Sequence, residues 1–429
     1  MTDSLKTELK PTSSHAAKVQ QIVSPGGIKA WLVEDYTVPL VSLELAFLGG
    51  ASQDPAALPG VATLLAGLLD EGAGSYDSEA FHRILEEQAI EISFSADRDL
   101  LVGRMQTLAR NKAKAFELLG LAVTRARLDI EPLERVKSQI SAGLRRETND
   151  PDHVASRTFR AIAYAGHPYG APVRGDLATI DSLSRQHIAD FRAASFARDN
   201  LTVAVVGAID APTLGTYLDD VFGSLPQKAS LLPVPDVVFA GVGRREIVDI
   251  DLPQSTIRFG RQGIPRDDAD FMPGIVVNHV LGGGVFSARL FREVREKRGL
   301  AYSVYSQLAA QDHSAMLFGG TSTKNERAAE SLEVIQGEIR SLSDAGPTDE
   351  ELDKAKKYLI GSYALRFDSS TKIAAHLVHL QAEGYGVEYL DARNKLIEAV
   401  TMDDAKRVAK RLFGDGSLLV AVAGRPVGL

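Results

Sequence analysis

The stretch from residue 281 to residue 305 reads LGGGVFSARLFREVREKRGLAYSVY and carries the most specific local pattern in the chain. It opens with three consecutive glycines at 282–284, where the backbone can come close to a ligand because no side chain is in the way. A strongly charged amphipathic segment follows, and Gly299 ends it before a run of residues that includes Tyr302. The pattern predicts a glycine loop, then a helix, then a strand.

The bulk composition describes an ordinary folded protein. The chain has 429 residues, of which 45% are hydrophobic and 24% charged, and this length suits two domains of roughly 200 residues each. A net charge of −8 argues against nucleic-acid binding as the main role. There is no cysteine, which excludes disulfides, thiolate metal sites and cysteine nucleophiles. No run of 18 apolar residues occurs, so we expect no membrane-spanning helix.

The two halves of the chain resemble each other. Residues 199–209 match residues 416–426 at an offset of 217 (416 − 199). Residues 133–137 match residues 352–356 at an offset of 219 (352 − 133). Two matches at nearly one offset indicate a duplicated domain. We therefore predict two homologous domains.

The predicted boundary lies in a segment that contains three prolines. We assign residues 1–225 to the first domain, 226–243 to a stiff linker and 244–429 to the second domain. Alternation of apolar residues predicts strands in the first domain over 30–34, 41–47, 90–97 and 100–107. Helical spacing predicts helices over 60–69, 78–88, 111–125 and 131–146. The fold class predicted is α+β, with a mixed or antiparallel sheet in each domain and helices packed on one face.

The chain resembles the M16 zinc metallopeptidases, the superfamily of pitrilysin and the mitochondrial processing peptidase, and within it the bacterial short-subunit (M16B-type) branch. The resemblance extends from about Gly27 to Gly424 and implies the metallohydrolase fold shared by LuxS and the processing peptidase. Four motifs carry it, at residues 49–52, 59–62, 167–170 and 293–302. The last of these is long and specific.

The resemblance also shows what is missing. Active relatives carry His-x-x-Glu-His on the first apolar helix, where two histidines bind zinc and the glutamate acts on the zinc-bound water. Thr63, Ala66 and Gly67 occupy those positions here, and the third ligand position falls near Ser141. Glu134 still occupies a supporting acidic position. These residues lack zinc-binding groups, so we expect no catalytic zinc and no cofactor in this chain.

Other histidines offer weak alternatives. His376, His379 and Glu383 fall on nearly one face of a predicted helix, yet ordinary helix histidines explain them better than a metal site does. His82 is interpreted as a surface residue paired at helical spacing. His279, just before the glycines, is interpreted as a packed or capping histidine.

The remaining features point to substrate handling. By resemblance, Arg298 and Tyr302 match an arginine and a tyrosine that reach the peptide beside the zinc. Arginine is a permanently charged fork of donors, and a tyrosine hydroxyl can meet a carbonyl or a developing oxyanion. Alternatively, Arg298 caps its helix and Tyr302 is a core aromatic. The glycines, Gly282, Gly283 and Gly284, resemble a substrate-facing loop, with a helix-capping turn as the alternative. A bound peptide is expected to add a strand to a sheet edge, which the sequence does not identify.

The leading hypothesis is a non-catalytic, substrate-binding subunit of a heterodimeric zinc metallopeptidase. A homologous catalytic subunit with His-x-x-Glu-His would supply zinc, ligands and base, and this chain would supply Arg298 and Tyr302. The first alternative is a structural scaffold, as in the core subunits of the respiratory cytochrome complex that share the fold. The second is a stand-alone peptidase of unrecognised chemistry, although no Gly-x-Ser-x-Gly elbow occurs. The lack of cysteine favours the periplasm, with the cytoplasm as the alternative.

Overall fold

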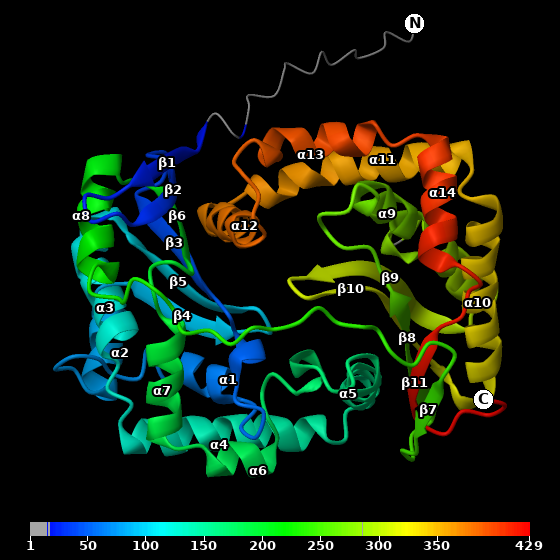
Figure 1. The fold of residues 1–429 in the computed structure, drawn as a ribbon, viewed down its shortest axis with the longest axis horizontal. Coiled ribbons are helices and arrows are strands. Elements are labelled where there is room, and N and C mark those ends of the chain that lie inside the picture. The colour runs from blue at the N-terminus through cyan, green and yellow to red at the C-terminus, as the bar shows by residue number, and fades with distance from the viewer. Residues whose placement is uncertain (1–14, 16–17, 285) are drawn as a thin grey trace, which may run out of the picture.

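A computed structural model describes residue 15, residues 18–284 and residues 286–429. Residues 1–14 and 16–17 of the predicted first domain, and Val285 beside the glycines, lie outside the described residues. The chain forms two α+β halves, each with one sheet and a layer of helices, which lie on the left and right of Figure 1. The predicted fold class is therefore confirmed. Within the described residues, no helix has the length and apolar character needed to cross a membrane.

The first half contains β1 (Gln20–Val23), β2 (Lys29–Glu34), β3 (Leu40–Leu48), α1 (Val61–Ala66), α2 (Ser78–Glu87), β4 (Ile90–Ala96), β5 (Leu100–Leu108), α3 (Lys112–Arg125), α4 (Ile130–Glu147), α5 (Pro151–Ala163), α6 (Leu177–Ser182), α7 (Arg185–Ser195), β6 (Leu201–Gly207) and α8 (Ala211–Phe222). The second half contains β7 (Arg245–Val248), β8 (Gln254–Gln262), α9 (Phe271–Asn278), two π-helices η5 (His279–Gly283) and η6 (Phe291–Glu296), β9 (Ala301–Gln311), β10 (Ser314–Lys324), α10 (Ala328–Ala345), α11 (Asp349–Tyr363), α12 (Ser370–Ala382), α13 (Tyr389–Glu398), α14 (Met402–Phe413) and β11 (Leu419–Ala423). Short 3-10 turns are η2 (Ala51–Gln53), η3 (Ala109–Asn111), η4 (Pro168–Gly170), η7 (Asn325–Arg327) and η8 (Ala364–Phe367).

Both sheets are mixed and are built alike. The first sheet has the strand order β1-β2-β6-β3-β5-β4, and the second has β7-β11-β8-β10-β9. In each sheet one strand pair is parallel, β2 with β6 and β7 with β11. The others are antiparallel. The matching orders β6-β3-β5-β4 and β11-β8-β10-β9 are what a duplicated domain requires.

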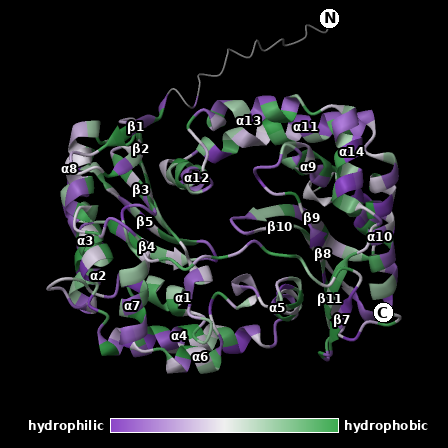
Figure 2. Ribbon diagram, viewed as in Figure 1, coloured by the Kyte–Doolittle hydropathy of each residue, from purple (hydrophilic) through white to green (hydrophobic). Residues whose placement is uncertain are grey.

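The position of each strand follows from its residue pattern. Central β3 is buried at seven consecutive residues, so both faces of the sheet are covered there. Edge strand β4 alternates, with Ile90 and Ile92 buried and Glu91 and Ser93 exposed, so only one of its faces is covered. Figure 2 shows hydrophobic residues along several strands of the first sheet, whereas the strands of the second sheet and the outer helices mix hydrophobic and hydrophilic residues.

The two halves exchange one helix each. Helix α5 of the first half packs on β8 and β11, and helix α12 of the second half packs on β3 and β6. Phe159 of α5 and Phe318 of β10 share one small core with Leu419, while Leu377 and Leu380 of α12 share another with Trp31. Helices α5 and α12 begin 219 residues apart (370 − 151), which is the repeat offset found in the sequence.

The tips of two equivalent hairpins meet between the halves. The Tyr169 hydroxyl donates to the carboxylate of Asp99, which lies between β4 and β5. The backbone nitrogen of His313, between β9 and β10, donates to the Tyr169 hydroxyl at 3.1 Å. Residues 223–244 form neither helix nor strand, and they are held in place by bonds such as the one between His167 Nε2 and the Pro235 carbonyl at 2.7 Å.

One buried histidine of α12 makes the stability of the chain sensitive to pH. His376 is 9% exposed, and its Nε2 lies 2.9 Å from the Tyr363 hydroxyl. Burial, aided by the positive charges of Arg366, His379 and Arg393, lowers the pKa of His376 to about 4. The unfolded chain therefore binds more protons than the folded chain between about pH 6.5 and pH 4, so stability must fall as the pH drops through this window.

We predict that replacing His376 with Gln flattens the acid-side loss of stability. The difference in unfolding free energy between pH 7 and pH 4 should shrink by on the order of 3 kcal/mol relative to the parent chain. Chemical denaturation at a series of pH values measures it. An unchanged pH profile in the variant, with the parent chain losing stability over the same window, would show that His376 is not the responsible group.

Candidate peptide-binding site

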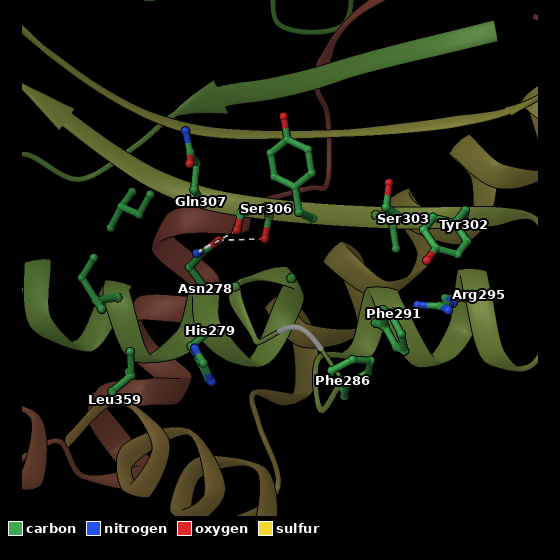
Figure 3. A pocket seen from close by; sticks show the side chains of 16 residues that line it. Asn278, His279, Phe286, Phe291, Arg295, Tyr302, Ser303, Ser306, Gln307 and Leu359 are labelled. Carbon is green, nitrogen blue, oxygen red and sulfur yellow. Dashed lines mark hydrogen bonds between the residues drawn. The ribbon is translucent and has the colours of Figure 1, made fainter. Parts of the chain in front are cut away.

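A cavity of about 690 Å³ lies between β9 and the two π-helices of the second half. This volume lies near the middle of the range of about 300–1,000 Å³ found for small-molecule sites. Figure 3 shows its side chains along β9 and along the helical segments below that strand. The cavity is lined by Ile275, Asn278, His279, Gly282, Gly283, Phe286, Phe291, Arg295, Leu359 and residues 302–308.

Strand β9 is the outermost strand of its sheet and pairs only with β10. From Val304 onward its residues alternate, because Val304, Ser306 and Leu308 face the helices while Tyr305 and Gln307 are exposed. Hydrogen bonds with Asn278 occupy the middle of this free edge. Asn278 Nδ2 donates to the Ser306 carbonyl at 3.3 Å, and Ser306 Oγ donates to Asn278 Oδ1 at 2.8 Å (Figure 3). An added strand would therefore have open backbone only on either side of Ser306.

The glycines differ from the loop that the sequence predicted. Gly282 and Gly283 belong to π-helix η5, so the prediction of a loop was wrong for these two residues. A Cβ on Gly282 would lie 2.6 Å from the Ser306 backbone nitrogen. Close packing of the helix on β9 therefore requires glycine at 282. A Cβ on Gly284 would lie 2.8 Å from His279 Nε2.

His279 is a packed histidine with one buried nitrogen that lacks a hydrogen-bond partner among the described residues. It is 5% exposed, and its ring stacks on Tyr358 at 4.9 Å between centroids. Burial lowers its pKa, which favours the neutral ring. Among the described residues, its Nε2 has no hydrogen-bond partner. π-Helices frequently occur at functional sites, and this one contributes His279, Gly282 and Gly283 to the lining of the cavity, while the His279 ring itself points away from β9 (Figure 3).

Tyr302 is not a core aromatic. Its ring is 82% exposed at the mouth of the cavity. The guanidinium of Arg295 lies 4.7 Å from the Tyr302 ring centroid and 4.7 Å from that of Phe291 (Figure 3). Cations over aromatic faces are stabilised by the ring quadrupole. Within the described residues, no carboxylate forms an ion pair with Arg295, so its charge is available to a ligand.

Arg298 has a different environment. Its Nη1 donates to the carbonyl of Glu293 at 2.9 Å and to the carboxylate of the same residue at 2.8 Å. Burial alone would raise the pKa of Glu293, but hydrogen bonds from Lys297, Arg298 and Arg292 outweigh it and lower this pKa to about 2. Arg298 thus anchors the end of its helix, and it is not among the residues that line the cavity.

Sequence reasoning missed Arg295. Residues 295 and 302 are seven apart, and the arginine that touches the Tyr302 ring is this one. One feature of the sequence could have indicated it. A helix that ends at Gly299 directly before a strand places its last turn, which includes Arg295, next to the first residues of β9. Choosing between Arg295 and Arg298 required the helical phase, and η6 is a π-helix whose phase differs from the usual 3.6-residue period.

The degenerate zinc positions of the first half do not fit a metal. The Thr63 hydroxyl donates to the Val173 carbonyl at 2.8 Å. Ala66 is 2% exposed and contributes only a methyl group to the core. A Cβ on Gly67 would lie 2.9 Å from Val136 Cγ1, so packing fills the space beside it. Ser141 is half-buried on α4. Helix α1 also ends at Ala66, earlier than the predicted helix over 60–69.

The other histidines have local partners. His376 is bonded to Tyr363 inside the core, while His379 Nε2 lies 2.6 Å from Glu383. His82 Nε2 lies 3.3 Å from Glu71. Throughout the part of the chain that the structure describes, no group of three or more His, Asp or Glu side chains is arranged to hold a metal ion.

The comparisons with known proteins agree with this picture. Residues 30–177 match the family described as "Insulinase (Peptidase family M16)", and residues 182–359 match "Peptidase M16 inactive domain". A relative from Helicobacter pylori, named "Non-peptidase homolog YmxG", is 26% identical over 352 residues, covering 82% of this chain and 81% of its own.

Solved structures match over nearly the whole chain. The "peptidase M16 inactive domain from Pseudomonas fluorescens" is 27% identical with a TM-score of 0.89, covering 95% of this chain and 98% of that one. A protease from Helicobacter pylori, 20% identical with a TM-score of 0.85 and coverage of 95% and 99%, shares the fold. The chain belongs to the M16 peptidase family, and its sequence contains no His-x-x-Glu-His motif.

Proposed function

We propose that this chain is the non-catalytic, substrate-binding subunit of a heterodimeric zinc metallopeptidase. A homologous M16 subunit with an intact His-x-x-Glu-His motif supplies zinc, its ligands and the general base. This chain supplies a surface that holds a peptide or unfolded polypeptide beside that centre. The observation that carries the proposal is the pair formed by the half-buried Arg295 and the exposed Tyr302 at the mouth of the cavity.

The chemistry of this pair suits an extended peptide. The guanidinium of Arg295 has a permanent charge, and Tyr302 presents a hydroxyl donor on a ring that is 82% exposed. Both groups can donate to a peptide carbonyl or to the oxyanion that develops when the carbonyl is attacked. The apolar wall of Phe286, Phe291 and Leu359 can hold a side chain of the same peptide.

The free edge of β9 supports the mode of binding. A peptide that adds to this edge gains main-chain hydrogen bonds with little demand on sequence. The Asn278–Ser306 bonds divide the edge, and of the two stretches that remain for pairing, one lies next to Tyr302. Gly282 and Gly283 line the same cavity and allow η5 to pack closely against β9 and Asn278, and Gly284 follows them directly.

Arg298 remains a second candidate for the arginine. Its bonds to Glu293 support an anchoring role in the free chain. A catalytic partner could draw the Arg298 side chain toward the substrate, at the cost of two hydrogen bonds. Arg295 and Arg298 are therefore replaced in separate variants, so that the contribution of each arginine to peptide hydrolysis is measured on its own.

We predict that Arg295→Ala combined with Tyr302→Phe lowers kcat/KM of the reconstituted heterodimer by about a hundredfold, because donors aimed at a developing oxyanion contribute that much. Hydrolysis of a quenched fluorescent peptide by the mixed subunits measures it. Tyr36→Phe, on an exposed ring that is not among the cavity-lining residues, is the matched control and should leave the rate unchanged.

The single variants separate the two arginines. Arg295→Ala should reduce the rate with little change in the melting temperature of the chain. Arg298→Ala should lower the melting temperature because it leaves Glu293 with fewer partners. If both double variants, each arginine with Tyr302, hydrolyse the peptide at the parent rate, the chain contributes no residue to the site and the scaffold alternative is favoured.

We also predict where the metal resides. The purified chain should contain less than about 0.1 zinc per molecule, and the heterodimer about one, since the positions of Thr63, Gly67 and Ser141 offer no ligand set. Elemental analysis after gel filtration measures both. A chelator should abolish hydrolysis by the pair and leave the melting temperature of this chain alone unchanged. Stoichiometric zinc in the isolated chain would refute the division of labour.

The cellular compartment is the periplasm in this proposal, because a chain without cysteine suits an oxidising compartment. Fractionation of the producing cell tests it. Recovery of the chain with the cytoplasmic fraction would favour the alternative compartment without affecting the assignment of the site.

A further inference from the structure

At the positions that correspond by resemblance to the zinc site, helices α1 and α4 pack directly against each other. Val136, Ile140 and Gly143 lie on one stripe of α4 at helical spacing and are all buried. This stripe faces the end of α1, since a Cβ on Gly67 would lie 2.9 Å from Val136 Cγ1. Ser141 is off the stripe and only half-buried. Of residues 141 and 143, it is therefore Gly143 that shares a face with Val136.

A guanidinium lies directly over Gly143. A Cβ on this glycine would be only 2.6 Å from Arg174 Nη2, so any larger residue at 143 would have to displace the arginine. The loop that carries Arg174 rests on the beginning of α1. The Val173 carbonyl accepts the Thr63 hydroxyl at 2.8 Å, and the Arg174 carbonyl would lie 3.1 Å from a Cβ on Gly60.

An ion pair fixes the arginine in this position. Arg174 Nη1 donates to the carboxylate of Glu147, the last residue of α4. The second oxygen of that carboxylate lies 3.4 Å from His153 Nδ1 in the first turn of α5. The Glu147 side chain is 23% exposed and the Arg174 side chain 42% exposed, so solvent partly screens the charge of the pair, and the guanidinium–carboxylate bond acts mainly by fixing the position of the arginine. The Glu147 side chain thus links α4 to the loop, and its second oxygen, which has no hydrogen-bond partner among the described residues, lies beside α5.

We propose that Arg174 is the fixed cation of the degenerate zinc position, and that it excludes a metal ion from it. A ligand carboxylate placed at residue 143 would meet the Arg174 guanidinium and form an ion pair with it. A metal ion would then compete with this pair and would also be repelled by the guanidinium charge. Restoring the lost ligands is therefore insufficient to restore a metal site. The proposal rests on the fold and the family, and it stands apart from the role proposed for the second half.

The test restores the ligands in two backgrounds. Both variants carry Thr63→His, Ala66→Glu, Gly67→His and Gly143→Glu, with Val136→Ala to make room beside residue 67. The first keeps Arg174, and the second adds Arg174→Ala. Cobalt(II) is the probe because its visible absorption reports tetrahedral binding without any need for peptidase activity. The variant without the arginine should bind cobalt roughly tenfold to a hundredfold more tightly.

The cobalt affinities of the two backgrounds decide whether Arg174 excludes a metal ion. Equal cobalt affinity in the two backgrounds would overturn the proposal, and so would the absence of binding in a folded Arg174→Ala background. Melting curves and gel filtration establish that both variants are folded. Moving the carboxylate to the other candidate position, with Ser141→Glu in place of Gly143→Glu, should give no cobalt binding in either background, because residue 141 lies off the stripe.

The native chain provides a measurement that does not depend on the rebuilt variants. Arg174→Met and Glu147→Gln should each lower the melting temperature by about 1–3 °C, and the double variant should lower it by less than the sum, because both remove the same pair. Additive effects, or a melting temperature unchanged by Arg174→Met, would show that the arginine does not join these helices.

Discussion

The mutual exchange of α5 and α12 is the constraint on which the rest of the structure depends. Each sheet has a second apolar face that its own helices leave uncovered, and a helix of the other half buries it. Leu377 and Leu380 are each 2% exposed or less, and Phe159 is fully buried. Side chains of this size contribute about 1.5–3 kcal/mol each on burial. Separating the halves would expose both faces at once, so the two halves stabilise each other.

This exchange also determines what the sheet edges can do. Because α12 and α5 cover central strands, the outer strands β4 and β9 keep one exposed face. The edge of β9 is then shaped by the π-helix that Gly282 allows to pack against it. The cavity and the Arg295–Tyr302 pair both lie along this one strand. A frame held from both sides is suited to present such groups in a fixed geometry.

Local patterns predicted the elements of the first half well because periodicity reports which face of an element is buried. The alternation over residues 90–97 predicted β4, and the apolar spacing over 111–125 predicted α3. The exchange of helices was not predictable, because an amphipathic pattern shows that a face is buried but not by which partner. The repeat offset identified equivalent helices yet gave no sign that they cross over. Because η6 is a π-helix, the usual helical spacing also did not show that Arg295, rather than Arg298, contacts the Tyr302 ring.

The two candidate sites differ in how far folding alone accounts for their residues. At the degenerate zinc position every residue has a structural partner: Thr63 bonds to the loop, Gly67 makes room for Val136, and Arg174 is paired with Glu147. Packing and these polar contacts account for the Thr63, Gly67 and Arg174 contacts, while the second carboxylate oxygen of Glu147 has no hydrogen-bond partner among the described residues. At the cavity it does not, since an aromatic ring left 82% exposed beside an arginine with no carboxylate partner among the described residues adds little to stability. Single exposed apolar residues need no explanation, but here Tyr302 borders a cavity together with Arg295. The residues that folding does not require are therefore the ones best explained by a ligand.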